Sequence, residues 1–239
     1  MIKIDGLTKY YGTFPALQDV SFNVEKGQVV GLLGLNGAGK PTCLRLLTGY
    51  LVPNSGSCLI NGMDVFDNSL EIKSLIGYLP EVPPLYPELA VEDYLRFVAR
   101  LRGVSAEDFP AEFLRVTELT RLQPARRALI GNLSLGYRKR VGIAQALIGS
   151  PPVLIFDEPI SGLDPVQIVE QRKLLRRLSE DHTILISSHI LTDVSRTCDR
   201  VVIIHQGKMA GQLEHDEMQD KLEERFVSMT AAPVMRVGG

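Results

Sequence analysis

The sequence predicts an α/β fold in which a mostly parallel β-sheet carries helices on both faces. Two observations support this prediction. Short, unbroken apolar runs occupy residues 29–33, 153–156, 183–186 and 201–204, and such runs are typical of strands buried on both faces. Helical patterns fall between the later runs, most clearly over residues 165–178. Strands that alternate with helices in this way form parallel sheets.

The N-terminal part of the chain adds shorter strands to this plan. Residues 1–5, 22–24 and 58–60 are predicted strands, and turn signals occur at 53–56 and 61–62. Turns of this composition join neighbouring antiparallel strands. We therefore expect a small antiparallel β annex beside the main sheet.

The middle of the chain is predicted to be a helical subdomain inserted into a single domain. The insertion covers about residues 88–149, which contain no apolar run of the strand type. The core of the domain is expected to comprise about 1–87 and 150–213, followed by a charged C-terminal tail over 214–239. Within the insertion, helical patterns fall at 91–101, 111–119 and 137–148.

Composition argues against several classes of protein. A net charge of −2 gives no general attraction to nucleic acid, so no nucleic-acid partner is expected. No apolar run approaches the roughly 20 residues that span a bilayer, and the N-terminus lacks the apolar segment of a signal peptide. The widely spaced Cys43, Cys58 and Cys198 suit a reducing compartment and read as structural residues. These features indicate a cytoplasmic protein.

Residues 34–42, GLNGAGKPT, contain the phosphate-binding pattern G-x-x-x-x-G-K, or Walker A motif. The loop follows the strand at 29–33 and precedes a helical pattern at 44–47, which is the context that this motif requires. Its backbone N–H groups, the Lys40 ammonium and the helix N-terminus all favour phosphate. A P-loop NTPase of the RecA-like class is therefore predicted. Its nucleotide-binding residues in this loop are Asn36, Gly37, Ala38, Gly39, Lys40, Pro41 and Thr42.

A second motif, of the Walker B type, ends the strand at 153–156. Asp157 and Glu158 follow that strand directly, so both carboxylates are expected at the carboxyl edge of the sheet, where ligands bind. Asp157 is expected to hold Mg²⁺, directly or through water. Glu158 is expected to orient and deprotonate an attacking water. A solvated acidic turn is the alternative, which the upstream P-loop disfavours.

A third motif, residues 133–140 with the sequence LSLGYRKR, opens a predicted helix. Ser134 is a suitable helix cap. The basic residues 138–140 oppose the helix dipole, which acidic residues normally complement in a first turn. An anion that docks at this helix start would resolve the conflict. A solvated basic face is the alternative interpretation.

Together, the three motifs resemble those of the nucleotide-binding subunits of ATP-binding cassette (ABC) transporters. The resemblance covers residues 2–211, and the stretch 133–140 resembles the signature that separates this family from other P-loop proteins. It implies that two subunits sandwich two ATP molecules, with the P-loop of one chain facing the signature of the other. Ser134 and Gly136 would then contact nucleotide bound by the partner.

The same resemblance assigns roles to isolated residues. Asp164 ends SGLD at 161–164, which matches the D-loop where the two subunits touch. His189 matches the switch histidine that senses the γ-phosphate, and Tyr11 stands where the family stacks an aromatic ring on adenine. Without the resemblance, His189 would read as a structural residue and Tyr11 as core packing.

Glu81 departs from the family pattern, because it occupies the place of the Q-loop glutamine. By the resemblance, its carboxylate would face Mg²⁺ or the attacking water, which makes Glu81 both a catalytic and a metal-site candidate. The stretch 78–87, YLPEVPPLYP, resembles export-type (ABC-2-like) cassettes that are encoded apart from their membrane subunits.

Pro41 is the more serious departure, because the family places Ser or Thr there as a Mg²⁺ ligand. Proline lacks both that hydroxyl and a backbone N–H. A hydrogen bond to a charged group is worth about 1.5–3 kcal/mol, or about ten- to hundredfold in affinity. The helix should tolerate proline in its first turn, although proline disfavours helical geometry at Lys40. Thr42 keeps a hydroxyl one position too late.

The resemblance implies an ATP-hydrolysing subunit that uses ATP and Mg²⁺ and powers transport through a separate integral membrane permease. The subunit would form a homodimer, or a heterodimer with another cassette, and lie peripherally on the cytoplasmic face of the cell membrane. Residues 81–94 would receive the coupling helix of the permease. One alternative is a nucleotide-responsive subunit whose hydrolysis is impaired by Pro41. Another is a soluble, non-transport ABC ATPase that acts on ribosomes or DNA.

Overall fold

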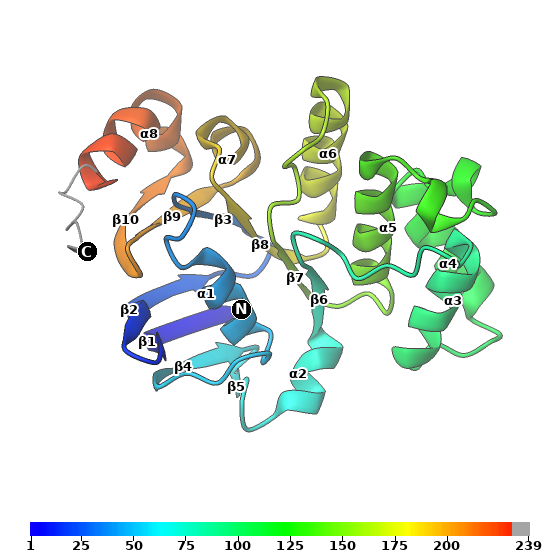
Figure 1. Ribbon diagram of the computed structural model, residues 1–239, viewed down its shortest axis with the longest axis horizontal. Coiled ribbons are helices and arrows are strands. Elements are labelled where there is room, and N and C mark those ends of the chain that lie inside the picture. The colour runs from blue at the N-terminus through cyan, green and yellow to red at the C-terminus, as the bar shows by residue number, and fades with distance from the viewer. Residues whose placement is uncertain (231–239) are drawn as a thin grey trace.

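The computed structural model describes residues 1–230 and contains two β-sheets (Figure 1). The larger sheet has the strand order β10-β9-β3-β8-β7-β6. All neighbours in it pair in parallel except β10, which is antiparallel to β9. The predicted mostly parallel sheet is therefore confirmed. Its strands are β3 (Val29–Leu33), β6 (Ile76–Leu79), β7 (Val153–Phe156), β8 (Thr183–Ser188), β9 (Arg200–His205) and β10 (Lys208–Glu214).

The smaller sheet is the predicted antiparallel annex, with the order β2-β1-β4-β5. Its first two strands are much longer than the sequence predicts. Register shifts interrupt the pairing of β1 with β2, for example between Ile4 and Leu7. Such irregularities break the alternation of apolar and polar residues that identifies a strand in a sequence. The four strands are β1 (Ile2–Tyr11), β2 (Phe14–Val24), β4 (Ser55–Ile60) and β5 (Met63–Asp64).

Two hydrophobic cores lie on opposite faces of the main sheet, and alternate residues of β3 enter each core. Val30 and Leu32 pack with α1 (Lys40–Leu47) and the annex. Val29 and Leu33 pack into the other core with the remaining long helices. The predicted cover on both faces is thus confirmed (Figure 1). The helices of the second core include α6 (Pro165–Leu178), α7 (Leu191–Thr197) and α8 (His215–Thr230).

The middle of the chain is helical as predicted, and lies at one end of the molecule (Figure 1). Proline occupies the first turn of α4, and Ser134 caps α5. Two single 3-10 turns, Gln123–Ala125 and Ile130–Asn132, join α4 to α5. The helices of this region are α3 (Val91–Leu101), α4 (Phe109–Leu119) and α5 (Leu135–Leu147), and α2 (Ser69–Leu75) precedes them.

Residues 208–214, at the end of the predicted core, form β10, and the first part of the predicted charged tail forms α8. Met218, Leu222 and Phe226 recur every fourth residue and are buried in the second core. The many charged residues between them conceal this apolar stripe in the sequence. Residues 231–239 of the predicted tail lie outside the described residues. Over residues 1–230, no helix has the length and apolar character required to cross a bilayer.

Gly77 allows α5 to pack closely against β6, which gives a direct test of this packing. A Cβ atom at Gly77 would lie 2.1 Å from the Ala146 carbonyl oxygen. We therefore expect Gly77→Ala to lower the free energy of unfolding by about 1–3 kcal/mol through overpacking. Each kcal/mol should lower the thermal midpoint by about 2–4 °C, measured by circular dichroism. Leu70→Ala, at an exposed position, is the control, and an unchanged midpoint for Gly77→Ala would contradict the packing described.

Candidate functional site

The P-loop connects the end of β3 to the start of α1, as predicted. Gly39 adopts φ +111° and directly precedes the helix. A Cβ atom there would lie 2.6 Å from the Ala16 carbonyl oxygen, so both the backbone conformation and the close approach of β2 require glycine. The backbone of the loop at Gly39 therefore packs closely against β2 of the annex.

Pro41 lies in the first turn of α1 and does not interrupt the helix. The Cys43 amide donates to the Gly39 carbonyl oxygen at 3.0 Å, which closes the first helical turn. Lys40 is the first residue of α1 although proline follows it. The predicted tolerance of proline is confirmed. Pro41 is exposed and Thr42 is half-buried.

Lys40 is buried and turns its ammonium group back onto the loop. Its Nζ donates to the carbonyl oxygens of Gly34 at 2.6 Å and Leu35 at 3.4 Å. The same Nζ lies 3.7 Å from Glu158 Oε1. Burial lowers the pKa of Lys40, and the carboxylates of Glu158 and Asp157 oppose that shift. These contacts keep a cation at the centre of the predicted phosphate site.

Glu158 is the carboxylate on which the site converges. Its Oε1 lies 2.9 Å from His189 Nδ1 in addition to the contact with Lys40. The side chain is buried, and the backbone adopts the left-handed φ of +48°, which is uncommon for a residue other than glycine. The structure thus brings together three residues that lie far apart in the sequence: the Walker A lysine, the Walker B glutamate and the histidine after β8.

Asp157 is buried and held by Ser187, a residue that no sequence motif identified. The Ser187 hydroxyl donates to Asp157 Oδ1 at 2.5 Å and accepts from the Glu158 amide at 2.9 Å. Burial raises the pKa of Asp157, and the Ser187 hydrogen bond opposes that shift. Ser187 follows the apolar run 183–186 directly, and parallel strands end at a common edge of the sheet. That placement was the signal that could have identified it.

Glu81 lies two residues beyond the end of β6 and is exposed. Its charge acts on Asp157, where it raises the pKa, and on Lys40, where it opposes the effect of burial on the pKa. Glu81 therefore shares the electrostatic environment of the Walker A and Walker B residues.

The protein atoms alone offer few ligands for a metal ion. Among residues 1–230, no group of three or more His, Cys, Asp or Glu side chains is arranged to hold one. Asp157 is a buried carboxylate at the predicted position, and Mg²⁺ in nucleotide enzymes commonly takes most of its ligands from phosphate and water. The donor set therefore fits a cation that arrives with a nucleotide and contacts the protein through Asp157.

The residues of the predicted signature and D-loop begin two adjacent helices. The Ser134 hydroxyl accepts from the Tyr137 amide at 3.4 Å and caps α5. Asp164 Oδ1 accepts from the amides of Val166 at 3.0 Å and Gln167 at 2.9 Å, which caps α6. A Cβ atom at Gly136 would lie 2.4 Å from Gln167 Oε1. The two helix starts therefore lie close together, and both Ser134 and Asp164 are exposed.

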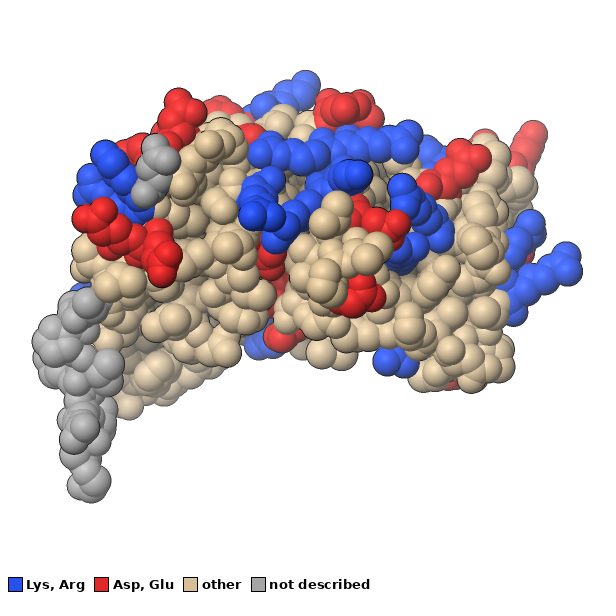
Figure 2. Space-filling view, turned by 90° about the horizontal axis from the view of Figure 1, so that it is seen from above, with Lys and Arg blue, Asp and Glu red and all other residues tan. Residues whose placement is uncertain are grey.

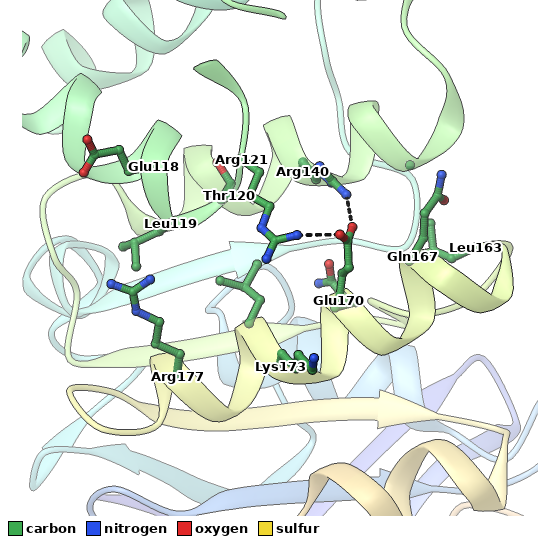
Figure 3. A pocket seen from close by; sticks show the side chains of 13 residues that line it. Glu118, Leu119, Thr120, Arg121, Arg140, Leu163, Gln167, Glu170, Lys173 and Arg177 are labelled. Atoms are coloured by element: carbon green, nitrogen blue, oxygen red, sulfur yellow. Dashed lines mark hydrogen bonds and ion pairs between the residues drawn. The ribbon is translucent and has the colours of Figure 1, made fainter. Parts of the chain in front are cut away.

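The basic turn of α5 is not a uniformly solvated face. Arg140 pairs with Glu170 of α6 at 2.5 Å, and Glu170 also pairs with Arg121 at 2.5 Å (Figure 3). Lys139 is buried and donates to the Glu158 carbonyl oxygen at 2.7 Å. The alternative of a solvated basic face is therefore wrong for this helix. Lys139 is a second site residue that the sequence motifs gave no separate role.

Other basic residues of α6 are also paired with acidic residues. Figure 2 shows Lys and Arg side chains gathered across the middle of one face, with Asp and Glu among them. Arg172 pairs with Asp193 and Arg176 pairs with Asp199, both at 2.5 Å. These pairs hold α6 to the segments that follow it.

Tyr11 ends β1 and is 46% exposed. It pairs with Phe14 across the hairpin that leads into β2, and β2 then passes Gly39 of the P-loop at Ala16. The structure therefore brings the hairpin alongside the P-loop, and adenine stacking on Tyr11 stays a prediction.

Comparisons with known proteins agree with this arrangement. A family model described as ABC transporter matches residues 17–161. The bacitracin transport ATP-binding protein BcrA of Bacillus licheniformis is 40% identical, over 92% of this chain and 72% of its own length. The lantibiotic transport ATP-binding protein SrtF of Streptococcus pyogenes is 39% identical, over 95% of this chain and 96% of its own. A solved ATP-binding subunit of an ABC transporter superposes with a TM-score of 0.86 at 31% identity, covering 96% of this chain and 99% of that one.

The position of Ser187 gives a test of the site that is independent of any ligand. We expect Ser187→Ala to lower the free energy of unfolding by about 1–3 kcal/mol, because it leaves the buried Glu158 amide without an acceptor. Thermal unfolding of the purified chain measures the effect. The control is Ser188→Ala, since the Ser188 hydroxyl bonds locally to Ile190: it accepts from the Ile190 amide at 3.0 Å and donates to its carbonyl oxygen at 3.4 Å. Equal midpoints for Ser187→Ala and the native chain would contradict the bridging role.

Proposed function

The chain belongs to the ABC transporter family, and from that premise we propose which of its residues convert ATP hydrolysis into transport. It is an ATP-binding and ATP-hydrolysing subunit of the export type, and it powers transport through a membrane partner. The observation that carries the residue assignment is the convergence of Lys40 and His189 on the Glu158 carboxylate.

In the proposed mechanism, the terminal phosphates of ATP replace the carbonyl oxygens of Gly34 and Leu35 as partners of Lys40. The Lys40 ammonium then neutralises phosphate charge. When Lys40 binds phosphate, its contact with Glu158 is lost. The Glu158 carboxylate is then free to accept a proton from the attacking water. His189, 2.9 Å from Glu158 Oε1, orients that carboxylate and contacts the γ-phosphate. Tyr11 stacks on adenine, and residues 36–42 cradle the phosphates.

A magnesium ion bound to the phosphates would stabilise charge that develops in the transition state. Asp157 is the residue proposed to hold it, with Glu81 as a second carboxylate in the same environment. Ser187 keeps the Asp157 side chain in place by its hydrogen bond to Oδ1. Pro41 supplies no ligand to the magnesium ion. We therefore propose that this chain hydrolyses ATP more slowly than it would with Ser or Thr at position 41.

We further propose that two cassettes, as a homodimer or with a second kind of cassette, enclose the nucleotides between them. The support is the exposed patch at the starts of α5 and α6, where Ser134, Leu135, Asp164 and Val166 face solvent. Gly136 is buried beneath this patch, against Gln167 of α6. Each chain is proposed to act as one domain, with the helical insertion at about 88–149 carrying the signature to the nucleotide held by the partner.

The permease is proposed to dock in a groove of about 1140 Å³ between α2, β6 and α3. Tyr86 packs edge-on against Tyr94 and Phe97 along this groove. Leu70 and Leu101, at its two sides, are 82% and 72% exposed. Exposed apolar side chains gathered at one place are typical of protein interfaces. Docking there would hold the chain peripherally on the cytoplasmic face of the membrane.

A nucleotide-responsive subunit with impaired hydrolysis is the second candidate, and Pro41 is the observation that favours it. We expect Pro41→Ser to raise the ATPase rate by about tenfold or more, because it restores a hydroxyl and an amide donor worth about 1.5–3 kcal/mol to a charged group. Steady-state rates and Mg²⁺ titrations of the two chains provide the measurement. A native chain that already matches Pro41→Ser in rate and Mg²⁺ dependence would contradict the assigned deficit.

The groove is tested by placing charge in it. We expect Leu101→Asp to weaken membrane association by about tenfold or more, since truncating one well-packed interface residue costs about 1–2 kcal/mol. The readout is the fraction of the tagged chain retained on washed membranes of its host. Leu114→Asp is the matched control, because Leu114 is 50% exposed on α4 and lies outside the groove. Equal retention of both variants and the native chain would exclude the groove as the docking site.

A further inference from the structure

The three consecutive basic residues of α5 have separate environments, and the middle one faces the interior. Arg138 is half-buried, and Arg140 is bound to Glu170 of α6 (Figure 3). Lys139 is only 5% exposed. Its ammonium group is therefore not available to an anion that approaches from solvent, and its role differs from that of a basic patch.

Lys139 binds the backbone of the turn at Glu158, which follows β7. Its Nζ donates to the Glu158 carbonyl oxygen at 2.7 Å. The carboxylates whose charges act on it are Glu158, Glu81 and Asp157. Burial of an ammonium group is unfavourable unless it is hydrogen-bonded. Here the hydrogen bond goes to a main-chain oxygen, so the contact fixes a peptide group as well as placing a charge.

The peptide that Lys139 binds has an unusual conformation. Glu158 has φ +48°, and a residue other than glycine keeps such a conformation only where its surroundings impose it. The Glu158 amide donates to Ser187, and its carbonyl oxygen accepts from Lys139 at 2.7 Å and from the Ser161 amide at 3.3 Å. The two side-chain bonds, from Ser187 and Lys139, hold the residue from both sides. Loss of either one would let the turn relax and move the carboxylate away from Lys40 and His189.

We propose that Lys139 is a positioning residue that couples the signature helix to Glu158. This proposal rests on the proposed function. Ser134 and Lys139 are five residues apart on one helix, which is about 7.5 Å along its axis. Nucleotide held by the partner contacts α5 at Ser134, and α5 holds the Glu158 backbone through Lys139. Occupancy of the partner's site therefore sets the orientation of the carboxylate in this chain's own site.

Two substitutions separate the hydrogen bond from the packing. Lys139→Met keeps much of the side-chain length but cannot donate, and Lys139→Gln keeps an uncharged N–H donor. The matched control is Lys173→Met, which removes an exposed lysine from α6. The full-length chain is assayed for ATPase rate against ATP concentration, for ATP binding and for thermal midpoint. Each variant is made in the native chain and in Pro41→Ser.

We expect Lys139→Met to lower kcat by about tenfold or more, because small displacements of a catalytic group have effects of that size. The KM for ATP and the thermal midpoint should stay close to those of the parent. The Hill coefficient for ATP should fall to about one, since the two sites lose their coupling. Lys139→Gln should recover part of the rate, and Lys173→Met should match the parent.

Unchanged kcat and Hill coefficient in Lys139→Met, in a parent that hydrolyses ATP, would overturn the role of Lys139 alone. A joint loss of ATP binding, rate and thermal midpoint in both Lys139 variants would also overturn it, because that result describes a purely structural residue. Absence of ATP hydrolysis in both the native and the Pro41→Ser chains would overturn the proposed function, and the coupling with it.

Discussion

The position of the Glu158 carboxylate is the constraint on which the rest of the site depends. Four side chains from three parts of the chain hold this one residue: Lys40 and His189 contact its carboxylate, Ser187 its amide and Lys139 its carbonyl oxygen. A buried carboxylate with fewer partners would be strongly unfavourable. The parallel sheet makes this convergence possible, because β3, β7 and β8 end at one edge.

The sequence predicts the parts of this arrangement that are local. β3, β7, β8 and β9 are predicted from their apolar runs, since strands buried on both faces do not need alternating apolar and polar residues. The P-loop and the Asp157–Glu158 pair follow from residue types at fixed spacing. β6 was missed because only its first and last residues are aliphatic, and β10 was missed because it contains charged and polar residues. α8 was missed because charged residues separate its apolar stripe.

The contacts that complete the site could not be predicted from sequence patterns alone. Lys139 appears in the sequence as one of three equivalent cations, and only the packing of α5 against the turn at Glu158 separates it from Arg138 and Arg140. Ser187 appears as the end of a strand. Its bond to Asp157 spans 30 residues, so it depends on strand order, which no local motif contains. Pro41 shows the opposite case: the sequence predicts the loss of a hydroxyl and an amide donor, while the fold accommodates the proline in the first turn of α1.

The proposed role of Glu158, as the catalytic carboxylate of a site completed by a second cassette, is tested most directly by light scattering. The variant is Glu158→Gln, made in the Pro41→Ser chain so that nucleotide binding is not limited by the proline. We expect ATP to convert this variant from a monomer of about 26.4 kDa to a stable dimer, because nucleotide is bound but not hydrolysed. A mass that stays that of the monomer at saturating ATP, with nucleotide bound, would contradict this role.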